Sequence, residues 1–296
     1  MASVQDLRRR IRSVRNTRKI TKAMELVASA RLRRAQARIE AMRPFADRTL
    51  ELMIGTARAA ASVHGLPLLR RREVRRAAIL ALTGDRGLAG AFNAQILRHA
   101  FALERTLAAE GIEVRWLVSG RKGASTLRFR GYRTLQAWTG FSDRPSYADA
   151  RAIAHRLAEL YVNEEIDRAV VVYNHFVSPL VQRVVQQDVL PIPEEMLERG
   201  EEEVRAAALL GDVIYEPEPE VILARLLPFY LETEIYRALL ESAASEQGAR
   251  MTAMRNASKN AGELIDTLTL AMNRARQAEI TQEILEVVAG ADALTR

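Results

Sequence analysis

The sequence predicts an α/β fold: a long antiparallel coiled coil of N- and C-terminal helices, plus a central α/β domain. Three observations lead to this prediction. Both ends of the 296-residue chain have long helical hydrophobic patterns, the C-terminal pattern is a heptad repeat, and the middle alternates between strand-like and helix-like stretches. The hydrophobic share of 48% and the charged share of 27% are typical of a folded globular protein.

The N-terminal segment, residues 1–60, is predicted to be one long helix. Apolar residues recur at steps of three and four, with a polar interruption from Arg15 to Lys19. The apolar positions are Val4, Leu7, Ile11, Val14, Ile20, Met24 and Val27. Residues with high helix propensity dominate, and we expect Pro44 to kink the helix. A helix of about 55 residues would be roughly 80 Å long at 1.5 Å per residue, which is too long for a compact domain.

The C-terminal segment, residues 217–290, is predicted to be a second long helix, with a bend expected at Pro228. Its second half repeats small and apolar residues in strict alternation of four and three, which predicts a coiled-coil seam. The expected seam consists of Ala257, Ala261, Leu264, Leu268, Ala271, Ala275, Ala278, Gln282 and Leu285. Because the chain offers this seam no other long helix, we expect it to pair antiparallel with residues 1–60.

The middle of the chain, residues 70–214, is predicted to form a Rossmann-like α/β domain. The expected strands are residues 75–82, 112–119, about 132–138 and 168–175. The expected helices are residues 91–110, 120–130 and 147–164. The final run LVQRVVQQDVLPIP follows a strand almost directly, so we expect it to add an antiparallel edge strand.

Composition narrows the class of protein. The chain has no Cys, so it has no disulfide, no thiolate nucleophile and no Cys-based zinc site. The longest apolar runs, residues 77–82 and 169–173, are far too short to span a membrane, and the basic N-terminus lacks the apolar core of a signal peptide. A net charge of +7 favours an acidic partner, but it does not distinguish a nucleic acid from an acidic protein.

The stretch LTGDRGLAGAFN, residues 82–93, raises the alternative of a nucleotide-binding enzyme, because it places three glycines between a strand and a helix. Its GxxGxxG spacing is not that of a dinucleotide-binding loop, and Asp85 would repel a phosphate. A tight strand-to-helix turn is the favoured interpretation. The four His residues lie far apart in the sequence without a carboxylate at ligand spacing. We therefore expect no metal, no cofactor and no catalysis by this chain alone.

Residues 8–48 carry fourteen Lys or Arg against three acidic residues, an excess of eleven positive charges. Like charges one helical turn apart repel each other, so this excess predicts a negatively charged partner surface. A nucleic acid is one candidate, and a DNA-binding helical protein remains the alternative. Residues 12–36 contain no aromatic side chain for base stacking, and their basic residues surround the helix. An acidic protein surface therefore fits better.

Four stretches of the chain resemble the gamma subunits of F-type ATP synthases. They are RSVRNTRKITKAMELVASARLRRAQ at residues 12–36, GDRGLAGAFN at 84–93, YEPEPE at 215–220, and the end of the chain from Ser245 to Leu294. The terminal ITQEILEVVAGADA is similar to that family's signature, with Ile280, Thr281, Glu283, Glu286, Gly290 and Ala291 in place. The resemblance covers essentially the whole chain. Ala89 stands where many relatives carry Cys, and the Cys-bearing regulatory insert of the chloroplast form is missing, which implies no thiol control.

The resemblance implies the central rotor shaft of an ATP synthase. Such a shaft couples proton flow through a membrane c-ring to ATP synthesis or hydrolysis at an alpha/beta ring, and it is not itself catalytic. The implied partners are three alpha and three beta subunits, an epsilon subunit and the c-ring, with no nucleic acid and no directly bound nucleotide. The implied location is the cytoplasmic side of the cell membrane, as a peripheral part of the complex.

The resemblance also implies contact residues. Lys22 and Met24 would meet an acidic loop of the beta subunits. A second set would meet the ring higher up: Arg276, Gln277, Thr281, Glu283 and Glu286. Tyr215 and Glu216 would face the c-ring or the epsilon subunit. For each of these residues, a purely structural role in its own helix or loop is the alternative.

Overall fold

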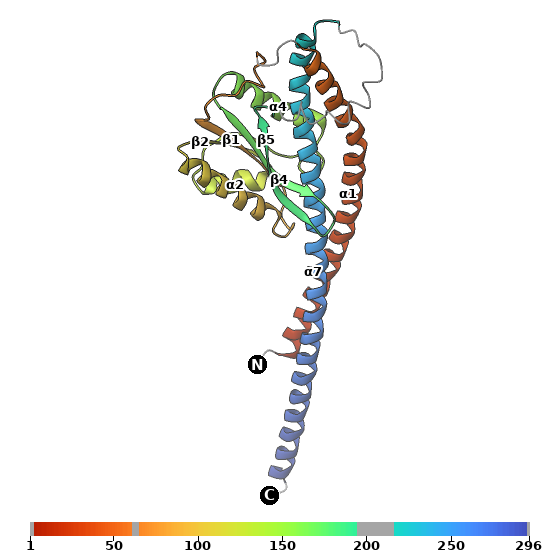
Figure 1. Cartoon of the computed structure of the whole chain (residues 1–296). Helices are drawn as coiled ribbons and strands as arrows, with labels where there is room; N and C mark the ends of the chain where they lie inside the picture. Colours follow the sequence, from red (N-terminus) through yellow and green to blue (C-terminus); the bar gives the residue numbers. More distant parts are fainter. Residues whose placement is uncertain (1–2, 61–64, 194–215, 295–296) are drawn as a thin grey trace. The chain divides into compact units, whose positions relative to one another are not determined.

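The computed structural model describes residues 3–60, 65–193 and 216–294. Its elements (Figure 1) are α1 (Val4–Ala59), β1 (Arg76–Leu82), α2 (Phe92–Ala109), β2 (Glu113–Ser119), α3 (Arg121–Phe129), β3 (Thr134–Trp138), α4 (Tyr147–Val162), β4 (Arg168–Phe176), β5 (Gln182–Leu190) and α7 (Pro219–Leu294). The two long helices and all of the expected central strands and helices are confirmed.

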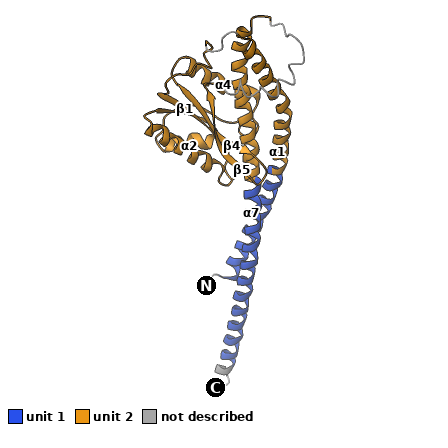
Figure 2. Ribbon diagram, in the orientation of Figure 1, with its two compact units in different colours: residues 1–28, 251–296 blue, residues 29–250 orange. Residues whose placement is uncertain are grey.

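The chain forms two compact units (Figure 2). Unit 1 consists of residues 1–28 and 251–296, and unit 2 consists of residues 29–250. Both α1 and α7 contribute to both units. The boundaries between the units therefore lie within the two long helices, not at their ends. The expected domain boundaries, at residues 1–60, 70–214 and 217–290, therefore stay a prediction.

Unit 2 contains a five-stranded sheet of order β3-β2-β1-β4-β5. β1 pairs in parallel with β2 and β4, and β2 pairs in parallel with β3. β5 pairs antiparallel with β4, because only a short turn separates the two strands. The predicted Rossmann-like fold with an antiparallel edge strand is confirmed.

Helices cover both faces of this sheet (Figure 1). In β1, Ala77, Ile79 and Ala81 face a core that α2 and α3 complete, whereas Ala78 and its alternate neighbours face a core completed by α4, α1 and α7. Strand side chains alternate between faces, so a β1 buried on both sides is apolar throughout. The α2–α3 layer is thus the outer face, away from the long helices.

The α1–α7 pairing in unit 1 is antiparallel. Glu25 pairs with Arg255, and Arg18 lies beside Gly262, where an added Cβ would be 3.7 Å from the arginine Cζ. The residue number therefore falls along α1 as it rises along α7. This arrangement confirms the predicted coiled coil of the two chain ends.

The α7 seam lies in a different register from the expected one. Seven buried or half-buried positions form the observed seam: Met254, Ser258, Ala261, Ile265, Leu268, Met272 and Ala275. Ala257, Gly262 and Thr269 beside them are also half-buried. The seven seam positions keep the alternation of four and three, and they share Ala261, Leu268 and Ala275 with the expected seam, whose first residue, Ala257, is half-buried next to them. Leu264 is 47% exposed, because the observed register buries Ile265 and half-buries Met272 instead.

The α1 seam also differs from the expected one at its centre. Ile20 is 60% exposed and Val27 is 52% exposed. The seven-residue repeat that starts at Leu7 and Ile11 continues at the same spacing through polar Thr21 and Glu25 before it returns to a small apolar residue at Ala28. The buried positions after Val14 are Thr21, Glu25 and Ala28. Apolar character alone therefore fails at Ile20 and Val27, whereas Val4, Leu7, Ile11, Val14 and Met24 are buried or half-buried as expected.

Candidate functional site

Glu25 is the polar centre of the helix pair in unit 1. Its carboxylate accepts a hydrogen bond from Lys22 Nζ at 3.0 Å and one from Arg255 Nε at 3.1 Å. Its side chain is only 9% exposed. The hydrogen bond from Lys22, followed by that from Arg255, lowers the pKa of Glu25 below its usual range. Glu25 therefore stays ionised at neutral pH and holds one cation from each helix.

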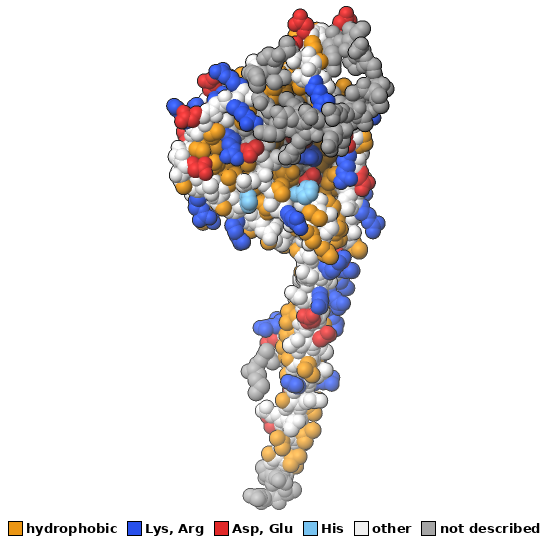
Figure 3. Space-filling model, viewed as in Figure 1, with side chains coloured by type: hydrophobic (Ala, Val, Ile, Leu, Met, Phe, Trp, Pro, Cys, Tyr) orange, Lys and Arg blue, Asp and Glu red, His pale blue; other side chains and the backbone are white. Residues whose placement is uncertain are grey.

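A groove with a volume of about 800 Å³ runs along unit 1. It is lined by Arg15, Arg18, Lys19, Lys22, Ala23, Leu26, Ser258 and Ile265. Figure 3 shows Lys and Arg side chains next to hydrophobic ones on this unit. Of the two residues expected at an acidic loop, Lys22 lines the groove and Met24 is half-buried on the same turn of α1. A basic and apolar groove of this kind suits an acidic protein surface.

Among the described residues of unit 1, no helix lies beside the last part of α7. Residues 276–291 are exposed throughout, because α1 begins at Val4, opposite the region of Ala275. All five residues expected to meet the ring here are exposed: Arg276, Gln277, Thr281, Glu283 and Glu286. Thr281 Oγ1 also donates a hydrogen bond to the Gln277 carbonyl at 2.9 Å, so part of its polar capacity is used within the helix.

Sequence reasoning missed the apolar surface at this end of α7. Five large apolar side chains are exposed there: Ile280, Ile284, Leu285, Val287 and Val288. Figure 3 shows hydrophobic side chains gathered near the end of the described part of α7. Leu285 was expected in the seam, but no partner helix reaches it. Spacings of three and four residues were a signal of one continuous apolar face, and such a face marks a contact surface.

A side chain of α7 occupies the space next to the glycine-rich loop of residues 82–93. A Cβ at Gly84 would lie 2.8 Å from the carboxyl carbon of Glu246, which is itself 1% exposed. Burial raises the pKa of Glu246, and this effect is partly offset by Arg250, whose Nη2 donates to Glu246 Oε1 at 2.5 Å. A carboxylate occupies the place where a phosphate would approach the loop. The structural interpretation of this loop is therefore favoured over a nucleotide site.

Asp85 joins this loop to two neighbouring loops. Its carboxylate accepts hydrogen bonds from the backbone N–H groups of Arg121 at 3.0 Å, Gly140 at 2.8 Å and Ser142 at 3.1 Å. Burial raises the pKa of Asp85, but these N–H donors outweigh it and hold the pKa below its usual range. Asp85 is thus ionised, and its hydrogen bonds link the three loops at the carboxyl edge of the sheet.

Asp143, in the loop after β3, links both long helices to that edge within unit 2. Arg31 Nη1 of α1 donates to Asp143 Oδ2 at 2.6 Å, and Gln247 Nε2 of α7 donates to Asp143 Oδ1 at 3.2 Å. Arg250 Nη1 lies 3.9 Å from the same carboxylate. Through Asp143 the sheet, α1 and α7 share one cluster of charges.

Metal and membrane signals are absent from the described parts of the chain. They contain no group of three or more His, Asp or Glu that could hold a metal ion. Three histidines instead have single polar partners: His99 with Gln186, His155 with Glu232, and His175 with Glu241. Across residues 3–60, 65–193 and 216–294, no helix has a stretch long and apolar enough to cross a membrane.

Of the last expected contact pair, Tyr215 and Glu216, only Glu216 lies within the described residues. Glu216 is exposed just before α7. Tyr215 lies outside the described residues. The structure therefore leaves the expected role of both residues as a prediction.

Comparisons with known proteins agree over the whole chain. A family model described as ATP synthase matches residues 3–294. The chain is 47% identical over 294 residues to the ATP synthase gamma chain of Rubrobacter xylanophilus, covering 99% of each. It is 45% identical over 296 residues to that of Moorella thermoacetica, covering 99% of this chain and 100% of the relative.

Two solved structures are similar in fold. One chain comes from the central stalk and c-ring of the Tetrahymena thermophila mitochondrial ATP synthase, with a TM-score of 0.58 and 26% identity, covering 81% of this chain and 99% of that one. Another comes from the Euglena gracilis mitochondrial ATP synthase, with a TM-score of 0.69 and 18% identity, covering 98% of this chain and 94% of that one.

Proposed function

This chain belongs to the family of ATP synthase gamma chains, and on that premise we propose that it works as a non-catalytic central rotor shaft. It rotates inside a ring of three alpha and three beta subunits and couples proton flow through a membrane c-ring to ATP synthesis or hydrolysis in that ring. No bond is made or broken on the chain itself. The work passes through its shape and through its contacts.

The observation that carries this proposal is the uneven surface of unit 1. One part of it is a basic and apolar groove centred on α1, and another is the exposed apolar end of α7. Inside a ring of three similar beta subunits, such a shaft presents a different face to each. It can therefore favour a different conformation in each subunit, and rotation exchanges those preferences.

If the shaft rotates, each single contact between the shaft and the ring must be weak enough to break at every step. Exposed ion pairs contribute about 0–1 kcal/mol each, whereas a deeply buried pair would hold one angle. The groove cations Arg15, Arg18 and Lys19 are exposed and suit such passing contacts. The Glu25 side chain is only 9% exposed, and its ion pair with Arg255, whose side chain is 56% exposed, joins the two helices of the shaft to each other instead.

For the contact residues we propose the roles that the family resemblance implies. Lys22 and Met24 meet an acidic loop of each beta subunit in turn. A second set meets the ring nearer the end of α7: Arg276, Gln277, Thr281, Glu283 and Glu286. Exposure of all five, and the position of Lys22 in the groove, support these roles. Tyr215 and Glu216 face the c-ring or the epsilon subunit.

The proposed location follows from the complex. The chain is held at the cytoplasmic side of the cell membrane by the c-ring and the epsilon subunit, as a peripheral component. It needs no cofactor and no bound nucleotide for this role.

Co-expression with alpha and beta subunits tests the proposal. We expect the chain to co-purify with both subunits as an active ATPase, whereas the purified chain alone hydrolyses no ATP. ATPase activity of the chain alone would contradict the non-catalytic role. Failure to join the alpha/beta complex would contradict the shaft.

A further inference from the structure

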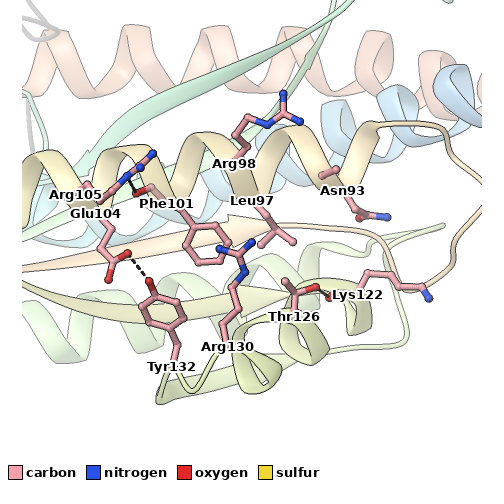
Figure 4. A pocket seen from close by; sticks show the side chains of 11 residues that line it. Asn93, Leu97, Arg98, Phe101, Glu104, Arg105, Lys122, Thr126, Arg130 and Tyr132 are labelled. Atoms are coloured by element: carbon pink, nitrogen blue, oxygen red, sulfur yellow. Dashed lines mark hydrogen bonds between the residues drawn. The ribbon is translucent and has the colours of Figure 1, made fainter.

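The outer face of unit 2 has a positively charged groove between α2 and α3 (Figure 4). Its volume is about 570 Å³, which lies within the range of small-molecule sites. It is lined by Asn93, Ala94, Leu97, Arg98, Phe101, Glu104, Arg105, Lys122, Thr126, Arg130 and Tyr132. The shaft role uses none of these residues.

The groove holds more positive charge than its own acidic residue can balance. Four cations line it, Arg98 and Arg105 from α2 and Lys122 and Arg130 from the α3 side, against the single carboxylate of Glu104. Within the described residues none of the four forms an ion pair. Glu104 is already engaged, since the Tyr132 hydroxyl donates to it at 2.9 Å. Three positive charges are left without a counter-charge.

Two aromatic side chains, Phe101 and Tyr132, line the groove. Phe101 stacks on Tyr132 with ring centroids 5.4 Å apart, and the buried Trp116 packs against both rings, with its centroid 5.4 Å from that of Phe101 and 5.5 Å from that of Tyr132. The Arg130 guanidinium lies over the Phe101 ring, 4.5 Å from its centroid. A cation held over an aromatic ring has its N–H groups already oriented, which reduces the entropy lost when it binds an anion.

One end of the groove lies at two helix N-termini. Asn93 is the second residue of α2, and Lys122 is the second residue of α3. The Asn93 Oδ1 accepts the Gly84 N–H at 2.8 Å, so its amide NH₂ is the end that remains to donate. Helix N-termini add a further positive potential there.

We propose that this groove binds a chain of two or three phosphoryl groups, either free or as part of a nucleotide. The wall from Asn93 to Arg105 is about 18 Å long at 1.5 Å per residue, which is too long for a single phosphate. A triphosphate has three or more negative charges, which match the three unbalanced positive charges. The arginine forks at Arg98, Arg105 and Arg130 suit phosphate oxygens.

The test is calorimetric titration of the full-length chain at about 0.15 M salt. Three ligands separate the sources: inorganic tripolyphosphate, ATP and adenosine. We expect both phosphate ligands to bind and adenosine not to bind. ATP binding more tightly than tripolyphosphate would assign the site to nucleotides, and equal affinity would assign it to the phosphate chain alone. Either result supports the proposal.

A matched pair of variants locates the site. Arg98→Gln with Lys122→Gln removes two cations from the groove, and we expect at least about a tenfold loss of affinity for tripolyphosphate. Arg128→Gln with Arg133→Gln makes the same change of charge at two exposed residues close in sequence that do not line the groove, and we expect unchanged affinity. All four side chains are exposed, so we expect both double variants to keep the fold. Thermal unfolding of each variant checks this.

Three results would overturn the proposal. The first is no binding of tripolyphosphate to the unmodified chain. The second is an equal loss of affinity in both double variants, which would mean general attraction to a basic surface. The third is poly-glutamate that binds as tightly as tripolyphosphate, which would assign the groove to an acidic protein.

Discussion

Glu25 of α1 and Arg255 of α7 are joined by a hydrogen bond of 3.1 Å across 230 residues of sequence. The Glu25 carboxylate lies where a coiled coil normally has an apolar side chain, and its charge is satisfied from both helices. A polar residue at such a position favours one alignment of the helices, because sliding them would separate Glu25 from Arg255 and leave it only Lys22 of its own helix. We infer that the pair of Glu25 and Arg255 favours the observed register of unit 1.

This pair predicts a pH-dependent contribution to stability. The pKa of Glu25 is lowered in the folded chain, so its stabilising effect is fully present above the unfolded value of about 4.3 and is lost as the pH falls through the folded value. We expect Glu25→Gln to reduce the free energy of unfolding by about 1 kcal/mol at pH 7. The deficit should shrink as the pH falls below about 4. Chemical unfolding followed by circular dichroism measures both.

Glu263 provides the control for Glu25. It lies 3.9 Å from Lys259 on α7, and both side chains are exposed. Glu263→Gln should change the stability by less than about 0.5 kcal/mol at either pH. A Glu25→Gln deficit that is the same at pH 7 and at low pH would mean that packing, and not the charge, is responsible.

The ion pair of Arg31 and Asp143 predicts measurable coupling within unit 2. The two side chains are partly buried and their charged atoms lie 2.6 Å apart. In a double-mutant cycle with Arg31→Ala and Asp143→Ala we expect a coupling energy of about 1 kcal/mol. The pair of Arg48 and Glu51 has the same 2.6 Å separation but is exposed, so its coupling should be below about 0.5 kcal/mol. Equal coupling in both pairs would contradict a structural role for Asp143.

The order of elements could be predicted from the sequence, because it depends on local periodicity. Alternation of strand-like and helix-like runs predicted the strands and helices of unit 2, and a strand followed almost directly by another predicted the antiparallel pairing of β4 and β5. The heptad spacing predicted that the chain ends pair. These signals lie within a few residues of each other in the chain.

The buried charges could not be predicted in the same way. Asp143 meets Arg31 across 112 residues, and nothing local to either residue identifies the other. Thr21 and Glu25 are buried in the seam while Ile20 is exposed, which reverses what hydrophobicity alone predicts. The hydrogen bonds and ion pairs that make burial of such polar side chains possible come from a helix distant in the sequence. They depend on tertiary pairing, so only the structure reveals them.

Gly120 predicts a severe local effect on folding. Its φ is +97°, and an added Cβ would lie 2.0 Å from the Thr83 carbonyl oxygen. Gly120→Ala should therefore destabilise unit 2 by about 3 kcal/mol or more. Gly111 has a φ of +78° with no atom within 4 Å of such a Cβ, so Gly111→Ala should cost only about 1 kcal/mol. Urea unfolding of both variants separates the steric clash from the backbone conformation, and similar losses would contradict the clash.

The proposed contact at Met24 predicts a coupling defect. Met24→Lys adds a positive charge next to a groove that is proposed to meet an acidic loop, so the loop should be held more tightly and rotation should be less well coupled to transport. In membrane vesicles with the assembled complex, we expect proton pumping per ATP hydrolysed to fall while the chain still folds. Ala37→Lys, at an exposed position further along α1, should pump normally. Unchanged pumping in Met24→Lys would count against the contact.

The exposed apolar face at the end of α7 predicts a variant that affects assembly but not folding. Ile284 is 58% exposed and Val288 is 53% exposed, one helical turn apart. Replacing both with Ser should change the stability of the free chain by less than about 0.5 kcal/mol, because neither side chain is buried in it. If the ring covers this face, each replacement removes about 1–2 kcal/mol of apolar burial from the complex.

Dissociation of the chain from the assembled complex measures that loss, and it should be faster in the Ile284→Ser, Val288→Ser variant. Val162→Ser is the control, since Val162 is equally exposed at the end of α4 and lies outside the proposed ring contact. If dissociation stays unchanged in the double variant, the ring does not cover this face. A large loss of stability in the free chain would mean instead that the face is buried within the chain itself.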